Sequence, residues 1–160
     1  MSFANGLYRV HTPNAVAEWN RTIATAWKDT TNRVKVFAYD WLGRQFALHG
    51  DKMVLQFSAG DLEFTEIPAN PVTFHNEILV DYRQEALAFD FYEAWIHSGG
   101  LPPKYADCAG YQKPLFLGGK DWIDNLETLD MDVYWTVTAP IIARAREVGT
   151  GGVIGQITIE

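Results

Sequence analysis

The sequence predicts an α+β fold in which helices flank an antiparallel four-stranded meander. Two observations lead to this class: four short apolar runs between residues 34 and 67, and two longer segments with apolar residues at helical spacing. The runs are rich in Val, Phe, Tyr, Leu and Ile, which favour β-strands. The expected strands span residues 34–39, 44–49, 53–57 and 62–67.

The connections between these runs set their direction. Residues 40–43, 50–52 and 58–61 each contain glycine together with Asp or Ser, residue types typical of tight turns. Connections this short join antiparallel strands, because a parallel return needs a long crossover. An antiparallel sheet can leave one face in contact with solvent. We therefore expect the helices to cover one face only.

The first helix is expected over residues 13–28, after a short lead of residues 1–11. Thr12 and Pro13 form a typical helix start, with threonine at the N-cap and proline in the first turn. Apolar side chains then recur every three or four residues, which indicates one buried stripe. The stripe consists of Val16, Trp19, Ile23 and Trp27.

A second helical region is expected over residues 71–98, again after a cap and a proline, Asn70 and Pro71. We expect one bent helix or two helices, with the bend near Asp81. Two glycines after Ser98 are a typical helix stop.

The C-terminal part is less regular. Residues 101–111 are expected to form a loop, and residues 126–131 a short strand. Asp132 is expected to cap a last helix, kinked at Pro140, although the residues after Asp132 also have strong strand propensity. A helix over 132–147 and a segment that begins as a strand are thus the two alternatives, and we favour the helix.

The last apolar segment, residues 153–159, is expected to form a terminal strand.

Length and composition indicate one folded domain, residues 1–160. The hydrophobic fraction is 48% and the aromatic fraction 14%, values typical of a folded protein. The single cysteine, Cys108, allows neither an internal disulfide nor a multi-cysteine zinc site. The sequence has neither a signal-peptide pattern nor an apolar run long enough to cross a bilayer. We therefore expect a cytoplasmic protein without membrane contact.

Negative charge is concentrated in one part of the chain. The net charge is −7, and residues 61–132 hold 14 acidic and 4 basic residues. An acidic surface repels nucleic acid and attracts basic partners. The alternative is that the charge serves solubility alone.

Residues for catalysis or metal binding do not form a recognisable pattern. The four histidines are scattered and lack the spacing of zinc ligands. Cys108 with His97 is the only nucleophile–base pair to consider, and no supporting motif surrounds it. We expect no catalytic residues, no metal site and no cofactor.

A row of carboxylates interrupted by an aromatic residue is the best candidate for partner binding. An acidic patch with an aromatic anchor suits an interface with a basic protein, whereas the alternative is a solvated face beside core aromatics. Trp41, at a predicted hairpin tip, is either packed onto the sheet, which we favour, or exposed as a second anchor. The candidate residues are Trp41, Asp121, Trp122, Asp124, Glu127 and Asp130.

Two segments resemble the SUKH superfamily, and in particular the bacterial immunity-type domains of type VI secretion and polymorphic toxin systems. Residues 37–48 (FAYDWLGRQFAL) resemble the strand–turn–strand of that superfamily, with Gly43 at the turn. Residues 110–135 (GYQKPLFLGGKDWIDNLETLDMDVYW) are similar to a run of its type VI branch.

The resemblance implies an α+β fold without established catalytic residues. It further implies a protein-binding module that neutralises a toxin by contact, with a secreted toxin domain as the candidate partner. A cytoplasmic regulator or scaffold of the same superfamily is the alternative, and a small hydrolase using Cys108 or the histidines is a third hypothesis.

Overall fold

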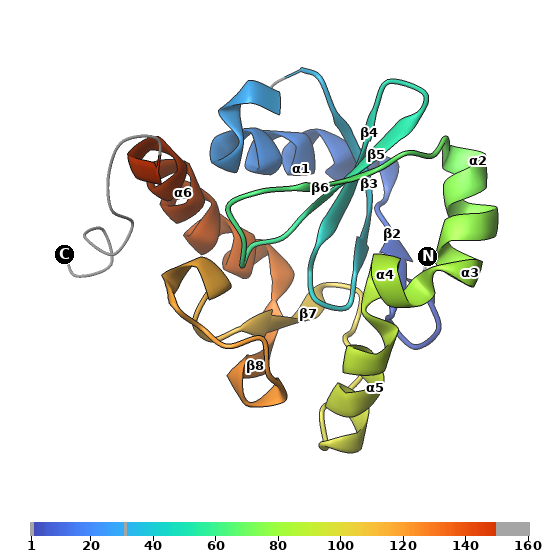
Figure 1. Cartoon of the computed structure of the whole chain (residues 1–160), viewed down its shortest axis with the longest axis vertical. Helices are drawn as coiled ribbons and strands as arrows, with labels where there is room; N and C mark the ends of the chain where they lie inside the picture. Colours follow the sequence, from blue (N-terminus) through green and yellow to red (C-terminus); the bar gives the residue numbers. More distant parts are fainter. Residues whose placement is uncertain (1, 31, 150–160) are drawn as a thin grey trace.

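The computed structural model describes residues 2–30 and 32–149. At its centre is an antiparallel sheet of six strands that follow one another in sequence order (Figure 1). The strands are β1 (Ser2–Phe3), β2 (Tyr8–Val10), β3 (Lys35–Asp40), β4 (Gln45–His49), β5 (Met53–Phe57) and β6 (Thr65–Ile67). A separate two-stranded ribbon pairs β7 (Asp107–Tyr111) with β8 (Leu126–Asp130).

The helical elements lie outside the sheet. They are α1 (Pro13–Ala26), the 3-10 turn η1 (Lys28–Thr30), α2 (Pro71–Thr73), the π-helical turn η2 (Phe74–Ile78), α3 (Leu79–Asp81), α4 (Arg83–Leu87), α5 (Phe89–His97), the 3-10 turns η3 (Leu115–Leu117) and η4 (Ile123–Asn125), and α6 (Met131–Gly149).

The α+β class and the predicted meander are confirmed, and the strand number is corrected from four to six. Strands β3 to β6 are the four expected over residues 34–67. The two additional strands come from residues 2–10, part of the short lead expected before the first helix. They form a hairpin and β2 pairs with β3. The predicted terminal strand, residues 153–159, lies outside the described residues.

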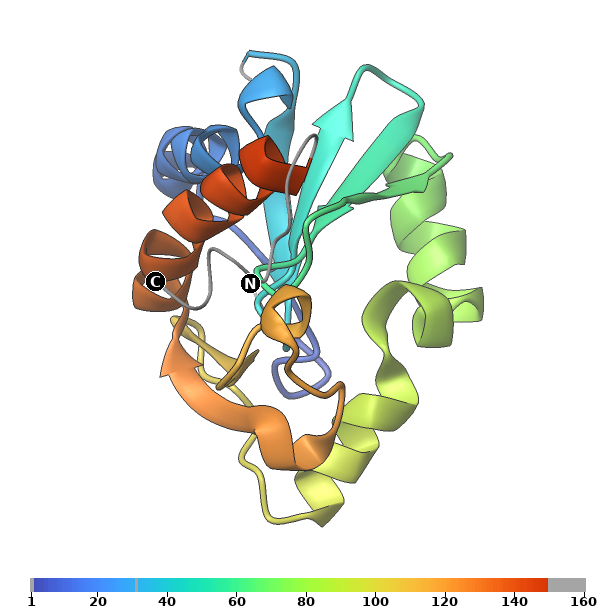
Figure 2. The same cartoon turned by 60° about the vertical axis from the view of Figure 1, so that its left-hand side comes forward.

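Helices cover both faces of the sheet, so the expectation of one covered face was wrong. Figures 1 and 2 show α1 and α6 on one side of the sheet and the run from α2 to α5 on the other. The reason is that successive strand residues are apolar. In β4, Phe46 packs under α2–α5, whereas the next residue, Ala47, packs under α1 and α6. Such near-continuous apolar runs are typical of strands buried on both sides.

A β-bulge in β3 changes which side chains face each layer. Val36 pairs with Ala47 but Ala38 pairs with Phe46, so Phe37 is an extra residue on this strand. Val36 consequently lies in the core beneath α1 and α6, while Ala38 lies in the core beneath α2–α5. Without the bulge these two residues would share a face.

The apolar stripe predicted for the first helix is buried over most of its length. Trp19, Ile23 and Trp27 lie in the core between α1, α6 and the sheet, and Val16 is only half-buried. Trp135 of α6 closes this layer and is completely buried. Its ring centroid lies 6.4 Å from that of Trp19 and 6.2 Å from that of Trp27.

The second helical region is interrupted twice. Asn70 caps its start, because its Oδ1 accepts a hydrogen bond from the backbone N–H three residues on, at 2.8 Å. The chain bends at Tyr82, directly after the predicted position, Asp81. A second interruption, at Ala88, separates α4 from α5 through a left-handed backbone with φ of 50°.

The predicted loop over residues 101–111 instead ends in strand β7, which pairs with the predicted strand β8. Tertiary packing explains β7 better than its own propensity does. A Cβ atom on Gly110 would lie 2.6 Å from Leu129 Cδ1 and 2.9 Å from Tyr134 Cε2, so the pairing needs a residue without a side chain here.

The last helix is confirmed as α6, and a strand at its start is excluded. Asp130 caps it in place of the predicted Asp132: the Asp130 Oδ1 atom accepts a hydrogen bond from the backbone N–H of Val133 at 3.0 Å. Neither α6 nor any other helix among the described residues is long and apolar enough to cross a membrane.

His11 is a buried polar residue between α1 and the sheet. Its ring stacks on Trp19 at a centroid distance of 5.3 Å and lies 4.4 Å from the Tyr39 ring. Its Nε2 atom donates a hydrogen bond to Gln45 Oε1 at 2.7 Å. Burial lowers the pKa of His11 to about 4, and the positive charge of Arg9 acts in the same direction. His11 is therefore neutral in the folded protein at pH 7.

We predict that protonation of His11 makes folding stability fall below neutral pH. Because its pKa is about 4 when folded and about 6.5 when unfolded, the unfolded chain binds the proton first as pH falls. The stability is fully present above pH 6.5 and is lost progressively towards pH 4, by up to about 3 kcal/mol. Urea unfolding at several pH values, compared between the wild type and His11→Gln, measures this loss. Identical pH profiles for the two proteins would contradict it.

Candidate partner-binding surface

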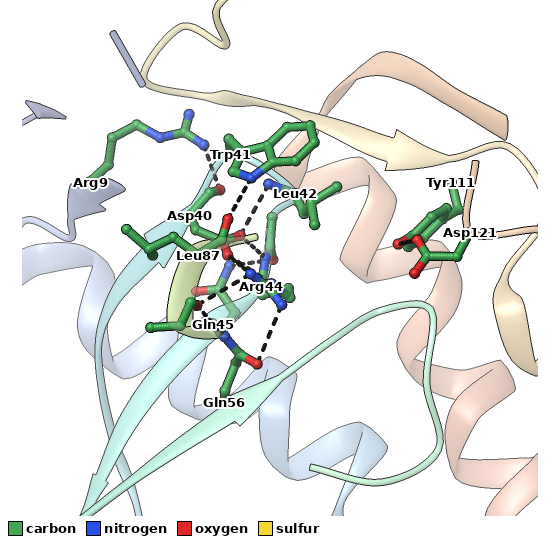
Figure 3. A network of polar contacts seen from close by, with 12 residues as sticks. Arg9, Asp40, Trp41, Leu42, Arg44, Gln45, Gln56, Leu87, Tyr111 and Asp121 are labelled. Carbon is green, nitrogen blue, oxygen red and sulfur yellow. Dashed lines mark hydrogen bonds and ion pairs between the residues drawn. The ribbon is translucent and has the colours of Figure 1, made fainter. Parts of the chain in front are cut away.

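A buried ion pair fixes the turn between β3 and β4. Asp40 is completely buried, and its carboxylate accepts hydrogen bonds from the backbone N–H groups of Leu42 and Arg44, both at 3.0 Å (Figure 3). The Arg44 guanidinium pairs with it at 2.7 Å. Burial raises the pKa of Asp40, and its contacts with Arg44 oppose that shift. The pair is therefore interdependent, since the completely buried Asp40 carboxylate would lack its compensating charge without Arg44, whose own side chain is only 15% exposed.

The same network donates hydrogen bonds to the carbonyl groups at the end of α4, which have no partner within the helix. Arg44 Nη2 and Gln56 Nε2 both donate to the Ala86 carbonyl, at 3.3 and 2.8 Å. Trp41 Nε1 donates to the Leu87 carbonyl at 2.9 Å (Figure 3). Side chains of the sheet thus cap α4, at the point where the left-handed residue ends it.

Arg9 extends the network to the segment before β7. It is completely buried, its Nη2 atom donates to the Asp40 carbonyl at 2.7 Å, and its Nη1 atom donates to the carbonyls of Lys104 and Asp107. Its guanidinium carbon lies 4.4 Å from the Tyr39 ring centroid. Arg9 therefore holds the segment before β7 against the sheet. Its position in the short lead before the first helix gave no indication of this role in the sequence.

Trp41 belongs to the core and presents no side chain to a partner in this structure. It is completely buried, and its ring packs on those of Phe91 and Tyr92 at centroid distances of 5.5 and 5.4 Å. The structure therefore supports the favoured alternative, packing onto the sheet, over exposure as a second anchor.

The other candidate residues are at the surface. Trp122 has 62% of its surface exposed. The carboxylates before and after it are exposed too, and within residues 2–30 and 32–149 none of the four forms an ion pair. They do not lie on one flat face, because alternation along β8 directs positions 127 and 130 to opposite sides of the ribbon. The four carboxylates are Asp121, Asp124, Glu127 and Asp130.

Asn125 fixes the loop that carries Trp122. Its Oδ1 accepts from the Lys113 backbone N–H at 3.0 Å, and its Nδ2 donates to the carbonyls of Lys113 and Lys120 at 2.8 and 2.9 Å. The Lys120 ammonium lies 5.9 Å from the Trp122 ring centroid. Lys120 thus stands beside Trp122, and the charge around this tryptophan is mixed. A side chain held on such a rigid loop loses little freedom on binding.

Two of the surface carboxylates also have structural partners. Asp121 accepts a hydrogen bond from the Tyr111 hydroxyl at 2.5 Å, an interaction that, with burial, raises the pKa of Tyr111 (Figure 3). Asp130 caps α6. Asp124 and Glu127 have no hydrogen-bond partner among the described residues, and they are therefore the carboxylates most available to a partner.

The structure does not support the Cys108–His97 nucleophile pair. Cys108 is completely buried, and burial raises the pKa of its thiol, which opposes formation of the reactive thiolate. His97 lies exposed at the end of α5. Among the described residues, no group of three His, Cys, Asp or Glu residues is arranged to hold a metal ion.

Comparison with protein families gives a match to part of the chain. Residues 77–141 match the family described as "T6SS immunity protein Tdi1, C-terminal". This match confirms the predicted resemblance to immunity-type domains of type VI secretion systems. A search of curated proteins found no match.

Comparison with solved structures gives a similar fold. The crystal structure of Atu4351 from Agrobacterium tumefaciens superposes with a TM-score of 0.60, covering 87% of this chain and 69% of that chain. Sequence identity is 11%, so the likeness concerns the fold alone.

The matched segment surrounds the sheet rather than forming it. It passes over one face as α3, α4 and α5, crosses the end of the sheet as β7 and β8, and returns on the other face as α6 (Figures 1 and 2). Residues 77–141 contain 11 acidic and 4 basic residues, whereas the rest of the chain is balanced. The net negative charge therefore belongs to the matched segment.

We predict that loss of the buried ion pair is far more costly than loss of a surface pair. Asp40→Ala leaves the Arg44 guanidinium without its partner and should lower the free energy of unfolding by about 3–5 kcal/mol. Replacing both residues, as in Asp40→Ala with Arg44→Met, should recover part of this loss. Urea unfolding measures both effects.

The matched control is Glu147→Gln, which removes an exposed ion pair with Lys28, where the two side chains are 63% and 70% exposed. Its effect should stay below about 1 kcal/mol. Equal losses for the buried and the exposed pair would refute the role assigned to Asp40.

Proposed function

We propose that this chain is a non-enzymatic immunity protein that acts in the cytoplasm and neutralises a cognate type VI toxin by direct contact. The observation that carries the proposal is the match of residues 77–141 to the Tdi1 immunity family. Cys108 is the candidate nucleophile in the sequence, and its burial keeps it from attacking a substrate. This supports an inhibitor that works by binding.

We further propose that the toxin presents a basic surface. The concentration of negative charge in the matched segment supports this, because opposite potentials across an interface speed association and favour the correct partner. The exposed Trp122 supports a contact at the same place, since an aromatic side chain on a rigid loop is a typical anchor.

The carboxylates on this surface should act mainly on the association rate. We predict that Asp124→Asn, Glu127→Gln and Asp130→Asn together slow association about three- to tenfold at low salt. The effect should shrink as salt rises, because screening shortens the range of the charges. The fold should persist, because asparagine also caps a helix well at position 130. The measurement is the association rate across a salt series, with this chain bound to a surface. The partner in solution is an inactivated toxin domain encoded by the adjacent gene.

A control variant with the same change in net charge separates a local from a global effect. Glu18→Gln, Asp51→Asn and Glu66→Gln remove three exposed carboxylates outside the matched segment. This control should associate nearly as fast as the wild type. If both triple variants slow association equally, the carboxylates act only through net charge and the proposed contact is wrong.

The neighbouring genes and a growth assay distinguish immunity from the alternative, a regulator or scaffold. An immunity protein should allow growth of cells that express the adjacent toxin domain. Failure to protect, with the chain folded and expressed, would favour the regulatory function.

A further inference from the structure

An apolar groove lies between the β1–β2 hairpin and the helices that follow the sheet. It measures about 430 Å³, within the usual range of binding pockets. One wall comes from the hairpin and the other from η2, α3 and α4. The side chains that line it are mainly apolar and come from Phe3, Ala4, Leu7, Tyr8, His75, Leu79, Val80, Arg83 and Leu87.

Apolar side chains at this groove remain in contact with solvent. Phe3 is 47% exposed and Val80 is 63% exposed, although both have a folded core close by. Phe3 stacks on Tyr8 with a ring-centroid distance of 6.2 Å, so it is held in place rather than loose. Exposed apolar groups gathered around a groove are typical of a surface that a partner covers.

The groove is formed before any partner binds. The hairpin wall is held by a hydrogen bond from the Tyr92 hydroxyl to the Asn5 carbonyl at 2.8 Å and by one from the Trp41 backbone N–H to the Leu7 carbonyl at 3.1 Å. Gly6 packs so closely on the Pro103 carbonyl oxygen that a Cβ atom would lie 2.4 Å from it. A preformed site avoids the entropy cost of ordering its walls on binding.

A hydrogen bond joins the two walls of the groove. His75 Nδ1 donates to the Pro71 carbonyl at 2.7 Å, which leaves Nε2 to accept from the Tyr8 hydroxyl at 2.9 Å. His75 belongs to the π-helical turn η2, and such turns are frequent at functional sites. These polar lining groups are therefore paired with each other, and the rest of the lining is available to apolar groups of a ligand.

Two carboxylates that adjoin the groove-lining residues in the chain favour a cationic ligand. Glu77 lies three residues before Val80, Asp81 directly follows it, and both side chains are exposed without an ion-pair partner among the described residues. Arg83, a cation among the lining residues, is held on the Phe89 ring with its guanidinium carbon 4.0 Å from the centroid, and the two carboxylates outnumber it. Positions 77 and 81 are neighbours along a helical face, so both carboxylates can meet one basic segment.

We propose that this groove receives a cationic amphipathic segment of the partner protein. Apolar side chains of that segment fill the groove between Phe3 and Val80, and its Lys or Arg residues pair with Glu77 and Asp81. The inference deepens the proposed function, because it assigns a contact region for the toxin apart from the loop of Trp122.

A synthetic amphipathic helical peptide of Leu and Lys, carrying a fluorescent label, tests the groove itself. Fluorescence anisotropy should show binding of this peptide, and no binding of the corresponding Leu and Glu peptide. Val80→Asn and Phe3→Ser change exposed side chains and should each weaken binding about tenfold. The matched control is Val137→Asn on α6, whose side chain is similarly exposed, at 60%, and this variant should bind as the wild type does.

The charge arm uses Glu77→Gln with Asp81→Asn, which should weaken peptide binding at low salt and less so at high salt. Equal binding by the wild type and Val80→Asn would overturn the proposal. A dimer of this chain would also overturn the proposal, if light scattering detects it and Val80→Asn dissociates it. The groove would then bind a second copy of the chain.

The adjacent toxin domain separates this inference from the proposed function. If Val80→Asn and Phe3→Ser leave toxin binding unchanged, the proposed role of the groove is wrong, while the proposed immunity function stands. If the chain does not bind the toxin but still binds the Leu and Lys peptide in the groove, the proposed immunity function is wrong and the proposed peptide-binding role of the groove is supported.

Discussion

The ion pair between Asp40 and Arg44 is the interaction on which the surrounding structure depends. Both charges sit at the turn from β3 to β4, where the two helical layers and the β7–β8 ribbon meet the sheet. Arg44 also supplies a donor to the end of α4, while the Asp40 carbonyl receives Arg9. A buried charge is tolerated only when it is paired and hydrogen-bonded, so this network also restricts the elements around it to one arrangement.

This arrangement explains how a segment that is mostly outside the sheet can present a rigid surface. The chain after β6 covers one face, crosses the end of the sheet and covers the other. The donors to α4 anchor it on the first face, and Arg9 anchors it where it reaches β7. The loop of Trp122 gains its own anchor from Asn125. Binding side chains held on rigid supports lose less conformational freedom when a partner arrives.

The charge and the apolar surface complement one another. Negative potential acts over a Debye length and affects encounter, whereas apolar contact acts at short range and affects how long a complex lasts. The acidic residues are spread over the matched segment, and the exposed apolar groups gather at the groove and at Trp122. A partner that is both basic and locally apolar would satisfy both features.

The sequence by itself determined the meander of residues 34–67, the helix after Thr12 and the cap at Asn70, because turn residues and apolar spacing act locally. It also located Trp122 and the exposed carboxylates. Only the tertiary structure decided that Arg9 and His11 are buried: alternating polar residues near a terminus ordinarily face solvent, and here their partners lie far along the chain. Segments far apart in the chain that meet only on folding also produce the second covered face, strand β7 and the groove. Local sequence patterns carry no information about such contacts.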